Sequence, residues 1–162
     1  MFTILLPGSF NPPTLGHLNL IERSSHLCQT LYVGIGQSSK KEQRLLSTEE
    51  TVRLLQQETS SLKNVTICSF TGLVVDFAKT IGARFLLKGI RNSYDLRYEM
   101  QQAAVNRELS EIETIFLPSH SETREISSSL IRELVQLGAP LNKFLPKSIA
   151  EAIHTASNQQ EK

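Results

Sequence analysis

The segment from Phe2 to His17 reads FTILLPGSFNPPTLGH. Its first part, Phe2–Leu6, is a short apolar run and predicts a strand that is buried on both faces. Gly8 then allows backbone angles that are closed to other residues, and the prolines that follow stiffen the turn. An amphipathic helix is expected over Gly16–Leu27. The segment is therefore a strand, a shaped turn and a helix, which is the first unit of an α/β fold.

The turn carries polar groups that suit a phosphate. Thr14 and His17 fall at or near the start of the helix, where unpaired N–H groups and the positive end of the helix dipole favour an anion. His17 would offer a ring N–H, and Ser9 would add a hydroxyl from the opposite side. A simpler alternative stays open at this point, in which His17 only caps a helix and the glycines only form a tight turn.

The rest of the chain repeats the alternation of apolar runs and helix-length segments. Strands are expected at Phe2–Leu6, Leu31–Ile35, Val65–Phe70, Phe85–Leu87 and Thr114–Leu117, and further helices from Ser47, at Leu73–Ile81, Asp95–Leu109 and Ser127–Leu137, and after Pro146. This order predicts an α/β, Rossmann-like, doubly wound five-stranded parallel sheet with helices on both faces, plus a C-terminal helix. Ligands bind such sheets at the carboxyl ends of the strands.

Composition narrows the class of protein. The 162 residues fit one domain, 1–162, whose last residues are expected to fray. Seventeen basic and sixteen acidic residues leave a net charge of +1, which favours neither nucleic acid nor membrane as a partner. Cys28 and Cys68 are expected to be reduced cysteines. The first apolar run is too short for a signal peptide, so a cytoplasmic location is expected. The four histidines have no metal-ligand spacing.

Two polar segments follow predicted strands. Ser38–Lys41 holds two lysines that would reach a phosphate at the carboxyl edge of the sheet, although paired lysines in a loop are more often only solvated. Leu87–Arg91 places Lys88 and Arg91 around Gly89, so both cations would converge on the same edge. A structural ion pair is the alternative for this second segment.

Two more segments lie on predicted helices. Asp95 and Glu99 share one helical face, where Glu99 would approach a ribose or the Mg²⁺ of a nucleotide, or would simply be solvated. Ser127, Ser128 and Ser129 occupy the first turn of a helix. They would cap backbone donors in any protein, and together they would also form a hydroxyl-rich cradle for a diphosphate.

Read together, these segments resemble the phosphopantetheine adenylyltransferase family, within a nucleotidyltransferase superfamily that carries a T/H-x-G-H motif and a late I-S-S-[ST] motif. Thr14–His17 and Ile126–Ser129 match those two motifs. The stretch from Lys88 to Arg107 reads KGIRNSYDLRYEMQQAAVNR and is similar to the signature of this particular family. The resemblance extends from about Phe2 to Ile153.

The resemblance implies an enzyme that transfers the adenylyl group of ATP, with Mg²⁺, to 4′-phosphopantetheine, giving dephospho-coenzyme A and pyrophosphate. By similarity, His17 and Lys41 would be catalytic, and Ser9, Lys41, Val74 and Lys88 would bind phosphopantetheine. The implied ATP site comprises Ser9, Phe10, His17, Gly89, Ile90, Arg91, Glu99, Thr123, Arg124, Glu125, Ile126, Ser127, Ser128 and Ser129. The family also implies a homohexamer and inhibition by coenzyme A.

Departures from the family pattern leave some questions open. Lys88 stands where the family usually has arginine, so the planar guanidinium group, which can make two parallel hydrogen bonds to a phosphate, is absent. The loop from Lys41 to Ser47 is longer than usual, which leaves Lys40 as a rival to Lys41, and Asn11 replaces a common aspartate. Two other functions remain as alternatives: a nicotinate-mononucleotide adenylyltransferase and a non-catalytic nucleotide-binding module.

Overall fold

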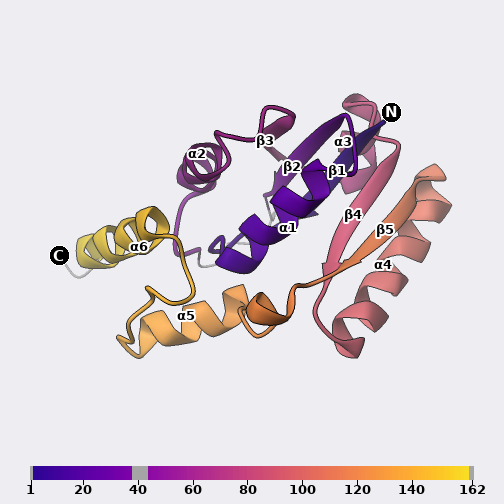
Figure 1. Ribbon diagram of the computed structural model, residues 1–162. Helices are drawn as coiled ribbons and strands as arrows, with labels where there is room; N and C mark the ends of the chain where they lie inside the picture. Colours follow the sequence, from indigo (N-terminus) through magenta and orange to yellow (C-terminus); the bar gives the residue numbers. More distant parts are fainter. Residues whose placement is uncertain (1, 38–43, 161–162) are drawn as a thin grey trace.

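The computed structural model of the protein describes residues 2–37 and 44–160, and its centre is a five-stranded parallel sheet (Figure 1). The strands are β1 (Thr3–Gly8), β2 (Thr30–Gly36), β3 (Val65–Phe70), β4 (Phe85–Ile90) and β5 (Glu113–Pro118). Their order in the sheet is β3-β2-β1-β4-β5, and every neighbouring pair is parallel. The chain therefore winds outward from β1 in both directions, which confirms the predicted doubly wound sheet and puts the switch point between β1 and β4.

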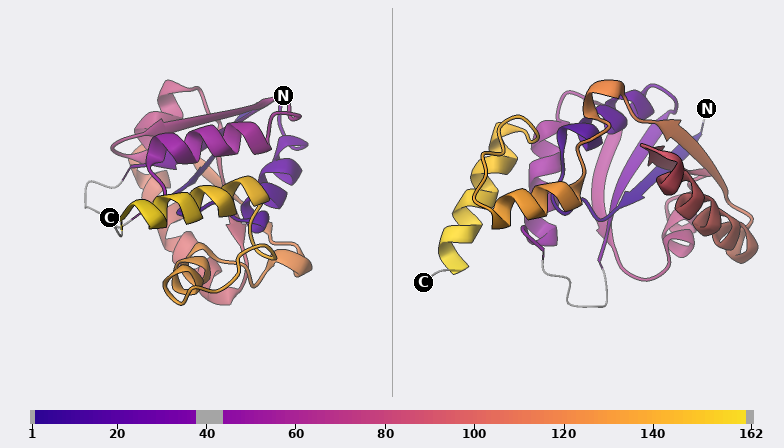
Figure 2. Two further views of the ribbon diagram at one scale, coloured as in Figure 1. Left: turned by 90° about the vertical axis from the view of Figure 1, so that its left-hand side faces the viewer. Right: turned by 90° about the horizontal axis from the view of Figure 1, so that it is seen from below.

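Helices cover both faces of this sheet, as predicted (Figure 2). They are α1 (Leu15–Ser25), α2 (Thr48–Glu58), α3 (Val74–Thr80), α4 (Ser93–Ser110), α5 (Ser128–Gln136) and α6 (Lys147–Gln160), with a short 3₁₀ turn at Ser121–Thr123. Successive side chains of a strand point to opposite faces of the sheet, so alternate residues of β1 belong to two different apolar clusters. Ile4 and Leu6 pack in a core with Ile21 of α1 and Leu55 of α2, while Leu5 packs with Val75 of α3.

The last two helices form a third apolar cluster beside the sheet. Ile131 of α5 packs with Ile149 and Ile153 of α6, and Leu54 of α2 joins them. Ile149 and Ile153 thus belong to the buried face of the C-terminal helix. This cluster fixes α5 against α2, so the first turn of α5 is held near the carboxyl end of the sheet.

The helix starts follow the polar residues that precede them. Thr14, Ser47, Asn92 and Ser127 are N-caps whose side-chain oxygens accept from a backbone N–H one turn later. The sequence Ser47-Thr48-Glu49-Glu50 predicts a mutual capping box between Ser47 and Glu50, which forms only in part. Ser47 accepts from the Glu50 N–H at 3.0 Å, but the Glu50 carboxylate instead receives two hydrogen bonds from Arg53, because the longer arginine reaches it on the same helix face.

None of the helices in residues 2–37 and 44–160 is both long enough and apolar enough to cross a bilayer.

The contact between α2 and the sheet gives a direct test of this core. Leu55 is fully buried in the cluster that joins α1, α2 and β1. We expect Leu55→Ala to lower the free energy of unfolding by about 2–5 kcal/mol, because it leaves a cavity in packed surroundings. Leu137→Ala is the control, since Leu137 is 74% exposed after α5 and should change stability by less than about 0.5 kcal/mol. Urea unfolding measures both, and equal effects would contradict this packing.

Candidate functional site

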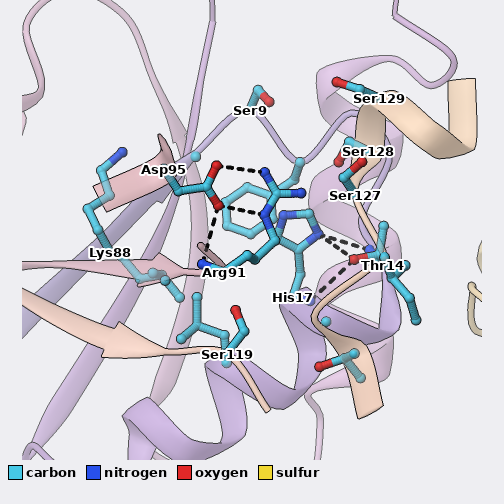
Figure 3. A pocket seen from close by; sticks show the side chains of 18 of the residues that line it. Ser9, Thr14, His17, Lys88, Arg91, Asp95, Ser119, Ser127, Ser128 and Ser129 are labelled. Atoms are coloured by element: carbon cyan, nitrogen blue, oxygen red, sulfur yellow. Dashed lines mark hydrogen bonds and ion pairs between the residues drawn. The ribbon is translucent and has the colours of Figure 1, made fainter. Parts of the chain in front are cut away.

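A pocket of about 430 Å³ opens at the carboxyl ends of β1 and β4, beside the switch point of the sheet (Figure 3). It collects residues from the turn after β1, the end of β4, α4 and the start of α5. The predicted site residues that line it are Ser9, Phe10, His17, Lys88, Gly89, Arg91, Glu99, Thr123, Ile126, Ser127, Ser128 and Ser129. Segments more than 100 residues apart in the sequence therefore meet at one rim, as the positions of the strand ends predict.

Other predicted site residues lie elsewhere. Val74 begins α3 and packs in the apolar cluster on the opposite face of the sheet from α1. Ile90 ends β4 without lining the pocket, and Arg124 and Glu125 are exposed beyond the 3₁₀ turn. Lys40 and Lys41 lie outside the described residues.

His17 is held by an unusual capping box at the start of α1. Its backbone N–H donates to Thr14 Oγ1, and its ring Nδ1 accepts from the Thr14 backbone N–H at 3.0 Å (Figure 3). A nitrogen that accepts from an amide cannot carry a proton, so the neutral ring holds its proton on Nε2. His17 can therefore both cap the helix and donate to a phosphate, the two roles considered for it, because capping uses Nδ1 and leaves Nε2–H as a donor.

The surroundings keep this imidazole neutral. Burial, with a smaller contribution from the nearby Arg91 charge, lowers the pKa of His17 from 6.5 to about 4. At neutral pH the His17 ring is therefore uncharged and acts as a hydrogen-bond donor. It does not carry the second ring proton that a protonated general acid needs.

The turn before α1 is strained at Phe10. Its φ angle is +46°, in the left-handed region that a non-glycine residue adopts only when its contacts impose it. The Phe10 ring is buried, lies 5.0 Å from the His17 ring, and packs on Gly8, where a Cβ atom would come within 2.9 Å of the phenyl ring. Glycine at position 8 therefore provides the space that the Phe10 ring occupies.

The carbonyl groups of the same turn are held from several directions. Arg132 of α5 donates to Asn11 O at 2.7 Å, and Ser128 Oγ donates to Pro12 O at 2.8 Å. Asn11 is buried, and its Oδ1 accepts from the Leu45 N–H at 3.0 Å. An aspartate oxygen can accept the same hydrogen bond, so the contact is kept in this chain, where Asn11 replaces the aspartate common in the family.

Two basic residues of the pocket, Lys88 and Arg91, are paired with acids. Arg91 makes a two-pronged ion pair with Asp95, at 2.8 Å and 3.1 Å (Figure 3). Lys88 Nζ lies 3.2 Å from Glu99 Oε2. The structural ion pair considered for this segment therefore exists. It does not remove the cations from the pocket, because all four side chains line it.

The serines at the start of α5 have different hydrogen-bond partners. Ser127 caps the helix by accepting from the Leu130 N–H, and Ser129 Oγ accepts from Arg132 at 3.0 Å. The backbone N–H groups of Ser128 and Ser129 donate to no other residue in the described part of the chain. The first turn of α5 thus offers the free amides that bind anions at helix N-termini.

Some pocket residues were missed in the sequence. Thr14 and Asp95 line the pocket but are not among the predicted binding residues, although Thr14 stands three residues before His17 and Asp95 four after Arg91, spacings at which side chains meet. Ser119 and Arg132 also line the pocket. The sequence around Ser119 carries no signal that would have found it. Within residues 2–37 and 44–157, no three His, Cys, Asp or Glu side chains gather in a way that could hold a metal ion.

Comparison with known proteins agrees with the motifs. The cytidylyltransferase-like family model matches residues 5–134. A phosphopantetheine adenylyltransferase of Lachnoclostridium phytofermentans is 41% identical over 155 residues, which are 95% of this chain and 94% of that protein. Proteins of the same name from Leuconostoc citreum and Haemophilus ducreyi are 41% and 38% identical, and the matches cover 98% of this chain and 100% and 99% of theirs.

The protonation state of His17 can be measured directly. In the ligand-free protein we expect ¹⁵N NMR to find the Nε2–H form at pH 7 and a pKa near 4. Since the unfolded chain takes up this proton at about pH 6.5, the histidine favours folding above pH 6.5, and that contribution is lost as the pH falls toward 4. A His17 pKa at or above 6.5 would contradict the arrangement described here.

Proposed function

Because the chain belongs to the phosphopantetheine adenylyltransferase family, we propose that its pocket joins the adenylyl group of ATP to 4′-phosphopantetheine, giving dephospho-coenzyme A and pyrophosphate. The observation that carries this proposal is the convergence of two helix N-termini, a neutral histidine donor and two cations on one pocket. That combination suits a reaction in which phosphate groups are brought together and charge develops on the α-phosphorus.

ATP binding is assigned to the turn after β1 and the first turn of α5. Ser9 and Phe10 line the pocket on one side and Ser127–Ser129 on the other. The amides of Ser9 and Phe10 donate to no other described residue, so they are available to phosphate oxygens. Gly89 and Arg91 complete this side from the end of β4.

The chemical step needs no protein base. The acceptor is a phosphate monoester whose second pKa is near 6, so it is largely dianionic at neutral pH. It attacks the α-phosphorus, a new P–O bond forms, and the bond to the β-phosphate breaks with pyrophosphate as the leaving group. His17 donates from Nε2 to an α-phosphate oxygen, where negative charge is stabilised during the displacement.

Lys88 is the described residue assigned to the phosphate of the acceptor, with Lys41 as its partner by family resemblance. Its present contact is the Glu99 carboxylate at 3.2 Å. An ammonium group has three donors, so Lys88 can keep the Glu99 contact and still bind a phosphate oxygen. Without the planar fork of arginine, it binds that phosphate through single hydrogen bonds.

The finer points of the proposal rest on the family resemblance. We expect ATP to enter as its Mg²⁺ complex, with the metal held by phosphate oxygens, and we expect the protein to act in the cytoplasm as a homohexamer. Helix α4 exposes several large apolar side chains, and these support self-association through that helix: Tyr94, Leu96, Tyr98, Met100, Val105 and Leu109. Multi-angle light scattering of the purified protein tests the hexamer.

The choice of acceptor separates this function from its nearest rival. A pyrophosphate-release assay with ATP should give turnover with 4′-phosphopantetheine and none above background with nicotinate mononucleotide. Turnover with nicotinate mononucleotide alone would overturn the proposal. ATP binding without pyrophosphate release from any phosphorylated acceptor would instead indicate a non-catalytic nucleotide-binding module.

For His17 we expect His17→Ala to lower kcat by about 10²–10³-fold, because one preorganised donor to the transition state is lost. His26→Ala is the matched control, since His26 is exposed at the end of α1, away from the pocket. A His17→Ala enzyme with wild-type kcat would refute the assigned role.

For Lys88 we expect Lys88→Ala to raise KM for phosphopantetheine about tenfold at saturating ATP, because a charge-assisted hydrogen bond to its phosphate is lost. Lys63→Ala removes an exposed lysine outside the pocket and should leave KM unchanged. An unaltered KM in the Lys88 variant would rule out this contact.

A further inference from the structure

Arg44 approaches the strained turn from outside the pocket. It lies just before α2, and its Nη2 donates to the backbone oxygen of Ser9 at 2.7 Å, across 35 residues of sequence. Its Nε donates to Leu46 O at 3.3 Å, which fixes the direction of the guanidinium group. Arg44 does not line the proposed catalytic pocket and instead borders a hollow between α2 and α6.

The Ser9 oxygen and the Phe10 N–H belong to the same peptide group. This group is planar, and it is trans, since the cis bond in the described chain is Asn11–Pro12. In a trans peptide the C=O and N–H bonds point in opposite directions. A cation that holds the Ser9 oxygen on the outer side therefore aims the Phe10 N–H away from Arg44, while Ser9 and Phe10 themselves line the pocket.

The contact also opposes a conformational cost. Phe10 has a φ angle of +46°, and such backbone strain persists only when the surroundings over-determine it. The neighbouring Leu45 N–H donates to Asn11 Oδ1. Together with the bond from Arg44 to Ser9 O, the segment before α2 thus makes a hydrogen bond to the turn on each side of Phe10. Donation to the Ser9 carbonyl also polarises the peptide group and makes the Phe10 N–H a stronger donor.

We propose that Arg44 is a positioning residue for ATP, which acts through the Ser9–Phe10 peptide by aiming the Phe10 N–H at a phosphate of the nucleotide. This role rests on the proposed function for the identity of the nucleotide. Arg44 itself makes no contact with substrate. Its removal should therefore weaken ATP binding and leave binding of phosphopantetheine nearly unchanged.

The test uses Arg44→Met, which keeps the length of the side chain and removes its donors, and Arg44→Lys, which restores one donor. Arg53→Met is the matched control because it removes an arginine from the same region, where Arg53 is paired with Glu50 on the surface of α2. Isothermal titration with α,β-methylene-ATP measures binding without turnover. Steady-state assays give KM for each substrate, and the amide shift of Phe10 in ¹⁵N NMR reports the peptide group.

We expect Arg44→Met to raise Kd for the analogue and KM for ATP about fivefold to tenfold, the range for losing a hydrogen bond to a charged group at a partly exposed position. KM for phosphopantetheine should change less than about twofold. The Phe10 amide signal should shift in the free protein, and Arg44→Lys should recover at least part of the affinity. Arg53→Met should behave as wild type.

Several outcomes would overturn the inference. These are unchanged affinity for the analogue in Arg44→Met, a rise confined to KM for phosphopantetheine, or an equal loss of affinity in Arg53→Met. A lower melting temperature without a change in analogue binding would identify Arg44 as a purely structural residue and also overturn it. If the wild type binds the analogue but does not adenylylate phosphopantetheine, the proposed function fails while the binding data still support the role of Arg44.

Discussion

The hydrogen bond from the Thr14 backbone N–H to Nδ1 of His17 sets most of the properties of this pocket. It closes the first turn of α1, and it fixes the ring in the form that carries its proton on Nε2. Because the ring is buried in that position, its pKa is near 4 and it stays neutral at physiological pH. This local contact thus determines where the helix begins and which nitrogen donates, while burial of the ring keeps the donor uncharged.

A second constraint is the shape of the turn between β1 and α1. The turn holds a phenylalanine with a positive φ angle, and its backbone oxygens are gripped by groups from α5 and from the segment before α2. Those elements reach the turn because a separate apolar cluster packs α5 and α6 against α2. The start of α5 and the segment before α2 therefore hold this turn together in its strained conformation.

Much of this could be predicted from the sequence because the relevant signals are local. Apolar runs and helix starts predict the five parallel strands and the helices between them, and the strand ends predict the rim where Ser9, His17, Lys88 and Ser127 meet. What could not be predicted depends on backbone direction and on distant partners. Glu50 binds Arg53 in preference to closing a capping box with Ser47, and Arg44 reaches Ser9 across 35 residues without any sequence motif. The packing of Val74 against the opposite face of the sheet also needed coordinates.

The ion pairs of the pocket have a consequence for selectivity among small anions. Lys88 and Arg91 each lie against a carboxylate, so the two pairs together carry no net charge before a ligand arrives. A lone inorganic phosphate has to compete with Glu99 or Asp95 and gains little, since it exchanges one anionic partner for another. A nucleotide that also reaches the amides of Ser9 and Phe10 and those at the start of α5 gains several contacts at once. We therefore expect the pocket to favour ligands that present several phosphate groups over inorganic phosphate.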